Sequence, residues 1–340
     1  MRLLRFLPLL FAVVLASCHE VKEYDATPRQ TFEQLWTILD EHYCFFREKG
    51  VDWEEVHSRY APMVADRMTS RELFDVMARM LDELRDGHTN LSASFCTSYY
   101  RRWWADYPEN FDWRLVQENY LNFNYISSAG IDYAVLTSNI GYIRYSSFSS
   151  PVGEGNLDAA LSYLAPCDGL IIDVRSNSGG SMTYVETIAR RFITDRTLAY
   201  SICHKTGPEH DAFSDPYPVY FNPAPEGRVM WDKPVVVLCN RGTFSAGNIF
   251  VSVMKSLPGV TVAGATTGGG SGMPFNSELT CGWGVRFSAS PLYDADGRLT
   301  EFGVEPTEGC AVDLDPEAAL AGRDTMIDFA VGLLGGNPQP

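Results

Sequence analysis

The feature that most constrains the fold of this chain is an apolar, β-branched run that ends in a turn and is followed at once by a helical pattern. The run Val235–Leu238 has the continuous apolar character of a strand buried on both faces, and Gly242 marks the turn after it. Beyond Ser245, apolar residues recur on one helix face, at Ala246, Ile249, Phe250, Val253, Met254 and Leu257. The pattern therefore predicts a strand–turn–helix unit with Ser245 at the junction.

The same alternation continues on both sides of this unit. Further strands are predicted at Gly141–Tyr145, Leu170–Val174, Val260–Ala263 and Val285–Ser288, and helices at Asn156–Leu164 and Tyr184–Phe192. Strands that alternate with helices favour an α/β layer fold with a mainly parallel sheet. Residues 203–233 are rich in Pro, Gly, Tyr and Phe and lack periodicity, so we expect a loop there, suited to a flap beside the site.

Ahead of this region the chain predicts a small helical bundle over residues 31–86. Asp52 is a candidate N-cap of one helix, and Thr69 with Glu72 forms the capping-box pattern of the next. We expect that helix to end at Asp86–Gly87, where glycine suits a left-handed turn. The predicted organisation is a signal segment over 1–17, a tether over 18–30, an N-terminal helical domain over 31–91 and an α/β core over 92–335.

The first residues have the pattern of an export signal. Arg2 and Arg5 precede the apolar run Phe6–Leu15, which at about ten residues is too short to span a bilayer. The tetrapeptide Leu15–Cys18 resembles a bacterial lipobox, which predicts cleavage before Cys18 and lipid attachment to that cysteine. The alternative is a buried N-terminal helix. We expect an exported protein held at the cell envelope by its lipid, on the periplasmic or cell-surface side of a membrane.

Charge and cysteine content exclude some function classes. A formal net charge of −16, with 27 basic residues and no basic cluster, argues against a nucleic-acid partner. Apart from Cys18, seven cysteines are scattered without paired metal-type spacing. Export permits disulfides, but an odd number in this arrangement allows no pairing to be assigned.

The position of Ser245 suggests chemistry. At the start of a helix, unpaired backbone N–H groups and the positive end of the helix dipole favour developing negative charge, which suits a nucleophilic serine beside an oxyanion site. The alternative is that Ser245 only caps the helix. A nucleophile needs a base, and His88 leads among six histidines because it follows the Asp86–Gly87 turn and can project into a cleft. Otherwise His88 is a cation that compensates a helix dipole.

Three more segments carry polar or glycine-rich patterns. In Asp173–Gly180 a strand enters a Gly-Gly turn whose backbone N–H groups can approach a ligand, although the phosphate-loop pattern is absent. Asp173 and Arg175 could pair there for structural reasons. Gly264–Gly272 is a second glycine cluster after a strand, and Glu301 and Glu305 flank a turn. Either glutamate could instead be solvated surface.

Five short motifs occur in a fixed order: Asp86–Thr89, Asp173–Gly180, Thr243–Gly247, Gly264–Gly272 and Gly303–Pro306. In kind and order they resemble the tail-specific, or C-terminal-processing, serine peptidases, in the branch that includes the tricorn protease core. The helical segment Phe32–Leu91 looks like the N-terminal part of that branch. The resemblance covers most of residues 31–335 and implies a ClpP/crotonase-type core of sheet and helices.

The resemblance also implies roles for single residues. Ser245 would attack a peptide carbonyl, His88 would be the general base, and Glu301 would orient or polarise the region of the base. The backbone N–H groups of Ala246 and of Gly179 or Gly180 would form the oxyanion hole. The implied activity is that of a serine endopeptidase that acts on peptides or proteins through an acyl-enzyme and needs no metal or organic cofactor.

The chain departs from the family pattern in three ways. The other main branch uses a serine–lysine dyad, but Gly264–Gly272 contains no lysine, and Lys255 lies ten residues beyond Ser245 on another part of the helix surface. Gly87 stands where the tricorn branch has a serine, so that auxiliary hydroxyl is missing. The segment between His88 and the α/β core is too short for a full PDZ domain.

Two other functions compete with a peptidase. One is a non-catalytic peptide- or lipid-binding protein on the same scaffold, which would not need the serine, the histidine and the Gly-Gly turn together. The other is an esterase of the α/β-hydrolase type. That motif places glycine two residues before the serine, where this chain has Thr243, so the esterase pattern is absent.

Overall fold

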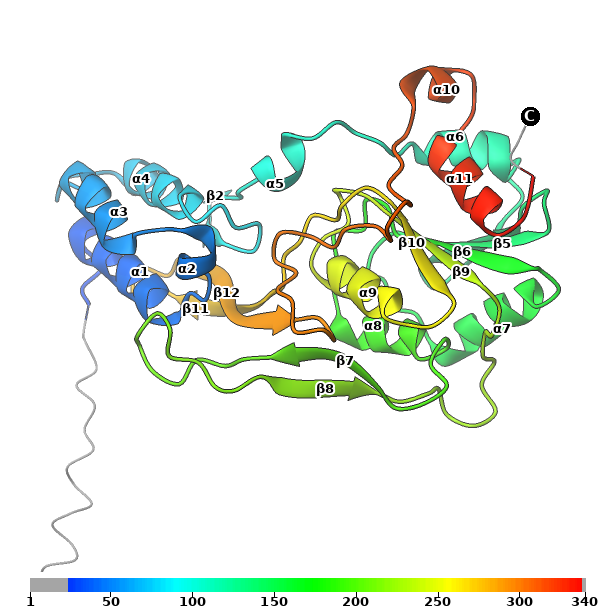
Figure 1. Ribbon diagram of the computed structural model, residues 1–340. Coiled ribbons are helices and arrows are strands. Elements are labelled where there is room, and N and C mark those ends of the chain that lie inside the picture. Colours follow the sequence, from blue (N-terminus) through cyan, green and yellow to red (C-terminus); the bar gives the residue numbers. More distant parts are fainter. Residues whose placement is uncertain (1–23, 338–340) are drawn as a thin grey trace, which may run out of the picture.

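The computed structural model of the protein describes residues 24–337, in which a group of N-terminal helices lies beside a larger α/β core (Figure 1). The predicted signal segment, the first part of the tether and Cys18 lie outside the described residues. All seven cysteines of the described part are free. No helix between residues 24 and 337 combines the length and the apolar character that crossing a membrane requires.

The core is built on a six-stranded sheet in the order β10-β9-β6-β5-β4-β3. The strands are β3 (Ile126–Ser128), β4 (Ile131–Val135), β5 (Ile140–Tyr145), β6 (Gly169–Asp173), β9 (Val235–Cys239) and β10 (Val260–Gly264). Strands β5, β6, β9 and β10 run parallel, and β3 and β4 extend the sheet as an antiparallel edge. The predicted α/β fold with a mainly parallel sheet is confirmed.

Helices cover both faces of this sheet, which explains the uninterrupted apolar runs of its central strands. On one face lie α7 (Glu154–Leu164), α8 (Met182–Ala189) and α9 (Ala246–Lys255). On the other lie α6 (Trp113–Leu115), η2 (Val116–Tyr120) and α11 (Thr325–Leu333). Along β6 the side chains alternate between the two cores, with Leu170 and Ile172 facing the first and Ile171 the second.

The second sheet connects the core to the N-terminal helices. Its order is β2-β1-β12-β7-β8, with β11 paired to β12. The strands are β1 (Asn90–Ala93), β2 (Cys96–Thr97), β7 (Thr197–Ile202), β8 (Tyr217–Phe221), β11 (Gly272–Glu278) and β12 (Gly284–Tyr293). The helices beside it are α1 (Pro28–His42), α2 (Phe46–Lys49), α3 (Trp53–Tyr60), η1 (Ala61–Met63) and α4 (Ser70–Asp82). Two short helices, α5 (Arg102–Ala105) and α10 (Pro316–Leu320), lie on connections.

The core of the N-terminal helices is completed by residues from far along the chain. Leu279, Trp283, Val285 and Phe287 are buried in the same cluster as the apolar faces of α1, α3 and α4. In Figure 1 this appears as the orange strands β11 and β12 beside the blue helices. The N-terminal region is therefore joined to the core through a shared hydrophobic cluster, and the domain boundary at residue 91 stays a prediction.

The N-terminal caps are as predicted, but the end of α4 is not. The Asp52 side chain accepts from the Glu55 N–H, and Thr69 and Glu72 form a complete capping box. Helix α4 ends at Asp82 instead of continuing to Asp86–Gly87, and the residue with a left-handed backbone is Arg85, with φ 48°. The expectation of a left-handed Gly87 is therefore wrong.

Gly87 is required for space, not for its φ angle. A Cβ atom on Gly87 would lie 2.7 Å from Nε1 of Trp103 and 2.8 Å from Cζ of Phe244. The two aromatic rings thus occupy the volume that a serine side chain would need at this position.

The segment 203–233 also differs from expectation. It contains β8, which pairs with β7 as the edge strand of the second sheet, and the two strands form a ribbon seen along the lower edge of Figure 1. The ribbon continues toward the N-terminal helices, where His210 Nε2 lies 2.7 Å from the Asp40 carboxylate. None of its residues lines the cavities beside Ser245, so the predicted flap is wrong. Sequence alone missed the strand because its cross-strand partner lies 15 or more residues away.

Candidate active site

Ser245 lies between the end of β9 and the start of α9, as the sequence predicted. Its backbone has φ 56° and ψ −124°, a conformation that costs a non-glycine residue about 1–3 kcal/mol. The side chain makes no capping hydrogen bond to the helix, so the alternative of a simple helix cap is excluded. Ser245 is half-buried, and its hydroxyl is not engaged by the helix. The Ser245 backbone N–H donates to the Gly269 carbonyl at 2.9 Å, which fixes the strained turn.

His88 faces this hydroxyl although 157 residues separate the two in the sequence. Its Nε2 lies 2.8 Å from Ser245 Oγ, and the residue is only 5 % exposed. Its ring lies against Phe244, with centroids 4.9 Å apart, and Phe244 in turn stacks on Trp103 at 4.1 Å. Phe244 and Trp103 therefore pack beside the imidazole, in space that is open because Gly87 has no side chain.

The protonation of His88 suits a base. Burial lowers the pKa of His88 to about 4, and the charges of Arg286 and Lys49 add to this effect while Asp86 opposes it. The imidazole is therefore neutral at neutral pH. In the tautomer with a free Nε2 lone pair, the Ser245 hydroxyl donates its hydrogen bond to the imidazole.

A buried charge cluster lies behind His88. The ammonium group of Lys49 lies 2.8 Å from the Glu301 carboxylate and 3.3 Å from the Asp86 carboxylate. Asp86 also accepts from the Tyr43 hydroxyl at 2.9 Å and from the His88 backbone N–H at 2.7 Å. We refer to Tyr43, Lys49, Asp86 and Glu301 as the lysine cluster.

Glu301 therefore reaches the region of the base through Lys49. Its second carboxylate oxygen accepts from the Ser271 backbone N–H at 2.8 Å. The Nδ1 atom of His88 is buried and has no hydrogen-bond partner within residues 24–337. Sequence reasoning missed Lys49, because a lysine on a short amphipathic helix resembles ordinary solvated surface until the tertiary fold buries it.

The two carboxyl groups of the lysine cluster titrate differently. Burial raises the pKa of Glu301 to about 7, with the Asp86 charge adding to the rise and Lys49 opposing it. Burial also disfavours the Asp86 charge, but the Lys49 ammonium, the imidazole and the His88 N–H together lower the pKa of Asp86. At neutral pH Asp86 is thus ionised while Glu301 is near its midpoint.

The Gly-Gly turn lies against Ser245, as predicted. Gly179 has φ 96°, and a Cβ atom there would lie 2.7 Å from the Phe244 carbonyl oxygen and from Ser245 Cβ. Its N–H already donates to Asn177 Oδ1 at 2.9 Å, so Gly179 does not offer the free donor that the prediction required. Gly180 is exposed beside it, and the Ala246 N–H lies in the first turn of α9, where helical N–H groups lack intrahelical partners.

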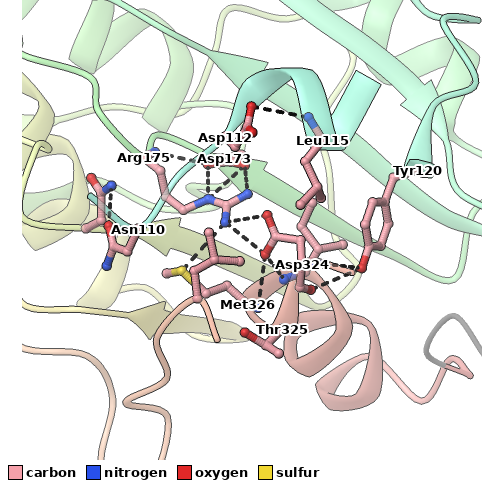
Figure 2. A network of polar contacts seen from close by, with 12 residues as sticks. Asn110, Asp112, Leu115, Tyr120, Asp173, Arg175, Asp324, Thr325 and Met326 are labelled. Atoms are coloured by element: carbon pink, nitrogen blue, oxygen red, sulfur yellow. Dashed lines mark hydrogen bonds and ion pairs between the residues drawn. The ribbon is translucent and has the colours of Figure 1, made fainter. Parts of the chain in front are cut away.

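A second buried charge cluster anchors this turn. The Arg175 guanidinium donates to Asp173 from Nε and Nη2 and to Asp324 from Nη1, at 2.6 to 3.1 Å (Figure 2). The Tyr142 hydroxyl donates to Asp173 at 2.8 Å. The structural pairing of Asp173 with Arg175 is confirmed, and it fixes the end of β6 to the start of α11. We refer to Tyr142, Asp173, Arg175 and Asp324 as the arginine cluster.

The remaining predicted segments have supporting positions. Gly264–Gly272 lies against the serine turn, where Gly269 accepts from Ser245 and the Gly268 N–H donates to Thr243 at 2.7 Å. Lys255 donates to the Glu305 carbonyl at 2.9 Å, so its ammonium is engaged with the chain after Gly303. In the part of the chain that the structure describes, no three His, Cys, Asp or Glu side chains gather as a metal site.

Two cavities open on either side of Ser245 and His88, and Gly180 and Arg286 also line both. The larger, of about 570 Å³, has an aromatic wall that includes Tyr99, Tyr100 and Trp103. The smaller, of about 100 Å³, is lined mainly by apolar residues such as Met182 and Ile249. An extended chain that crosses Ser245 would occupy both.

Comparison with known proteins finds a matching family model for each of the two regions. Residues 139–309 match peptidase family S41, and residues 24–82 match the tricorn protease C1 domain. The chain is 29% identical over 173 residues to a carboxyl-terminal-processing protease of Synechocystis sp. and 29% identical over 171 residues to the carboxy-terminal processing protease CtpA of Bacillus subtilis. Each alignment covers 50% of this chain but only 38% and 34% of those proteins, so the chain spans about a third of the curated relatives it matches.

Solved structures extend the similarity over the whole fold. A crystal structure of a candidate peptidase from Parabacteroides merdae is 50% identical with a TM-score of 0.86, covering 91% of this chain and 97% of that chain. The tricorn protease matches with a TM-score of 0.56 at 16% identity, covering 91% of this chain and 36% of that chain. Mature CPAF matches with a TM-score of 0.68 at 12% identity, covering 91% and 97%. The last two likenesses show the fold alone.

Proposed function

The chain belongs to peptidase family S41, and from this premise we propose that it is an exported, lipid-anchored serine endopeptidase acting through an acyl-enzyme on Ser245. The observation that carries the proposal is the 2.8 Å approach of His88 Nε2 to Ser245 Oγ. The neutral imidazole and the strained serine backbone support it, because together they present a hydroxyl with an adjacent base.

The proposed reaction begins when Ser245 Oγ attacks the carbonyl carbon of the scissile peptide bond and its proton passes to His88 Nε2. The carbonyl oxygen becomes an oxyanion, which the N–H groups of Gly180 and Ala246 would stabilise. The imidazolium then protonates the leaving amine, the C–N bond breaks and an ester remains on Ser245. Water then attacks this ester while His88 takes a proton from the water. The carboxylic acid product is released, and the proton returns to Ser245 to restore its hydroxyl.

We assign Lys49, Asp86 and Glu301 positioning roles behind the base. The His88 backbone is held by the Asp86 carboxylate, which is held in turn by Lys49 and Tyr43. Glu301 acts through Lys49 in this proposal, since its carboxylate contacts the ammonium and not the imidazole. The negative charge of Asp86 also favours the imidazolium that forms during catalysis.

The test is the Ser245→Ala variant, assayed for peptide hydrolysis and for labelling by a serine-directed phosphonate. We expect both to be lost, with a fall in kcat of about 10⁵- to 10⁶-fold where a nucleophile is removed. The matched control is Ser149→Ala, because Ser149 lines the same cavity and no hydrogen bond joins it to His88 within residues 24–337. His88→Ala should also suppress labelling, whereas equal labelling of wild type and Ser245→Ala would remove Ser245 as the nucleophile.

The same experiment separates a peptidase from a non-catalytic peptide- or lipid-binding protein. A binding protein on this scaffold would retain peptides or lipids without hydrolysis and would not react with the phosphonate. The lipid anchor is tested apart from activity, since Cys18→Ser should release the protein from the cell envelope into the soluble fraction. Retention of that variant at the membrane would contradict lipidation at Cys18.

A further inference from the structure

The charged residues that line the two cavities are positive, whereas the net charge of the protein is negative. The chain carries a formal net charge of −16. Yet among the described residues that line either cavity beside Ser245 there is no aspartate or glutamate, whereas Arg101 and Arg286 are present. A positive lining attracts anions and repels cations. The two cavities therefore favour an anionic group, although the protein as a whole is negatively charged.

Strand alternation directs Arg286 into the cavities. Its neighbours in β12, Val285 and Phe287, are buried in the core of the N-terminal helices, so Arg286 projects from the opposite face of the sheet. Asn90 lies opposite Arg286 in β1 and lines the larger cavity with it. Arg286 lines both cavities together with His88, and its positive charge contributes to the lowered pKa of His88.

Both arginines keep their donors available. Arg286 and Arg101 are exposed, and neither side chain makes an ion pair or hydrogen bond within residues 24–337. The guanidinium carbon of Arg101 lies 6.0 Å from the centre of the Tyr99 ring. By contrast, the exposed Arg298 pairs with Asp296 at 2.9 Å.

We propose that Arg286, assisted by Arg101, binds a carboxylate of the peptide substrate beside the scissile bond and so selects anionic peptides. Arg286 lines both cavities, as Ser245 does, whereas Arg101 lines only the larger one and would reach a more distant substrate residue. A guanidinium suits this task because its planar fork donates two parallel hydrogen bonds to a carboxylate. The inference rests on the proposed function, since it concerns the substrate of the same site.

The experiment uses a peptide library in which each position in turn carries Glu, Gln or Lys, with every peptide made both as the free acid and as the C-terminal amide. Cleavage by the full-length protein gives kcat/KM, and binding to Ser245→Ala is followed by fluorescence anisotropy. We expect Glu to exceed Gln by about tenfold at one position near the cleaved bond. The preference should fall as salt is raised.

Variants assign that preference to Arg286. Arg286→Gln should reduce the Glu-to-Gln ratio to about one, and Arg286→Glu should make Lys the preferred residue by opposite-charge pairing. Arg298→Gln removes an exposed arginine outside both cavities and should leave the ratio unchanged. If free acids are preferred over amides while Glu and Gln are equal, the bound carboxylate is the chain terminus.

The outcomes separate this inference from the proposed function. Cleavage of Glu, Gln and Lys peptides at equal rates, with no difference between acids and amides, overturns the selection of anions while the peptidase stands. Tight binding of Glu peptides to Ser245→Ala, with no cleavage by the wild type, supports the carboxylate site and contradicts the peptidase. An unchanged preference in Arg286→Gln also overturns the role of Arg286.

Discussion

The lysine cluster and the arginine cluster have the same parts and support opposite sides of Ser245, one behind the base and one behind the Gly-Gly turn. Each has a buried cation between two carboxylates. In each, a tyrosine hydroxyl and the backbone N–H two residues along donate to the same aspartate. The residues are Tyr43, Lys49, Asp86 and Glu301 in the first, and Tyr142, Asp173, Arg175 and Asp324 in the second.

The two differ in the geometry of the central cation. Arg175 holds both of its partners through a planar fork, and its side chain is fully buried. Lys49 is a point charge, 2.8 Å from one carboxylate and 3.3 Å from the other, and the Glu301 pKa is raised to about 7. Similar composition thus gives a fixed anchor in one place and, beside the base, a cluster that can exchange a proton near neutral pH.

The largest effect on stability is expected from Arg175→Met. Removing the cation leaves two buried carboxylates with their hydrogen bonds but without a compensating positive charge, which costs about 3–5 kcal/mol in comparable buried pairs. Urea unfolding followed by circular dichroism measures the free energy of unfolding. Arg175→Lys is the matched control and should recover only part of the loss, because lysine cannot span both carboxylates as a fork. A full recovery would mean that charge alone, not geometry, defines the anchor.

Lys49→Met should cost less stability, about 1–3 kcal/mol, because Glu301 can take up a proton when its partner is lost. Its main effect should be on activity. We expect kcat/KM to fall by about tenfold. This is less than the ~10²- to 10⁴-fold that a general base contributes, because Lys49 only positions the base. Lys49→Arg retains the charge and is the control. If Lys49→Met lost stability as Arg175→Met does, with no separate loss of activity, the distinction between the clusters would disappear.

Glu301→Gln should change how stability depends on pH. The folded pKa of Glu301 is raised from 4.5 to about 7, so its contribution to stability is full below pH 4.5 and is lost as the pH rises through about 7. His88 acts in the opposite sense, because its folded pKa is lowered from 6.5 to about 4. The His88 contribution is present in both the wild type and Glu301→Gln. The difference between the Tm values of these two proteins from pH 4.5 to 7 therefore reports the ionisation of Glu301.

In that comparison the wild type should lose stability relative to Glu301→Gln as the pH rises. The lowered pKa of Asp86 places its titration below this range. A Tm difference that does not change with pH would show that Glu301 is already ionised throughout and that the lysine cluster is as fixed as the arginine cluster.

The smallest effects should come from a matched pair of hydroxyl deletions. Tyr43→Phe and Tyr142→Phe each remove one hydrogen bond to a buried aspartate, at 2.9 and 2.8 Å, and each should cost about 1 kcal/mol of unfolding free energy. Only Tyr43→Phe should also change the acid limb of the kcat/KM profile, since Asp86 interacts with His88. Equal profiles for both variants would argue against a link between the lysine cluster and the base.

Local patterns were sufficient wherever the signal was continuous in the chain. The apolar run of β9 and the spacing of α9 placed Ser245 at a strand–helix junction, and Thr69 with Glu72 marked the start of α4. Where the signal depended on distant partners, prediction failed. β8 was missed because it is defined by pairing with β7, and Gly87 was assigned to a left-handed turn although packing against Trp103 explains it.

The sequence by itself determined the α/β class, the junction that carries Ser245, and His88 and the Gly-Gly turn as candidates for the same site, because each depends on the order of neighbouring residues. Only the tertiary structure decided that His88 reaches Ser245, that Gly179 already donates its N–H, and that Glu301 is linked to the base region through Lys49. The reason is that burial and contact between residues far apart in the chain set these distances and charges, and no local pattern encodes them.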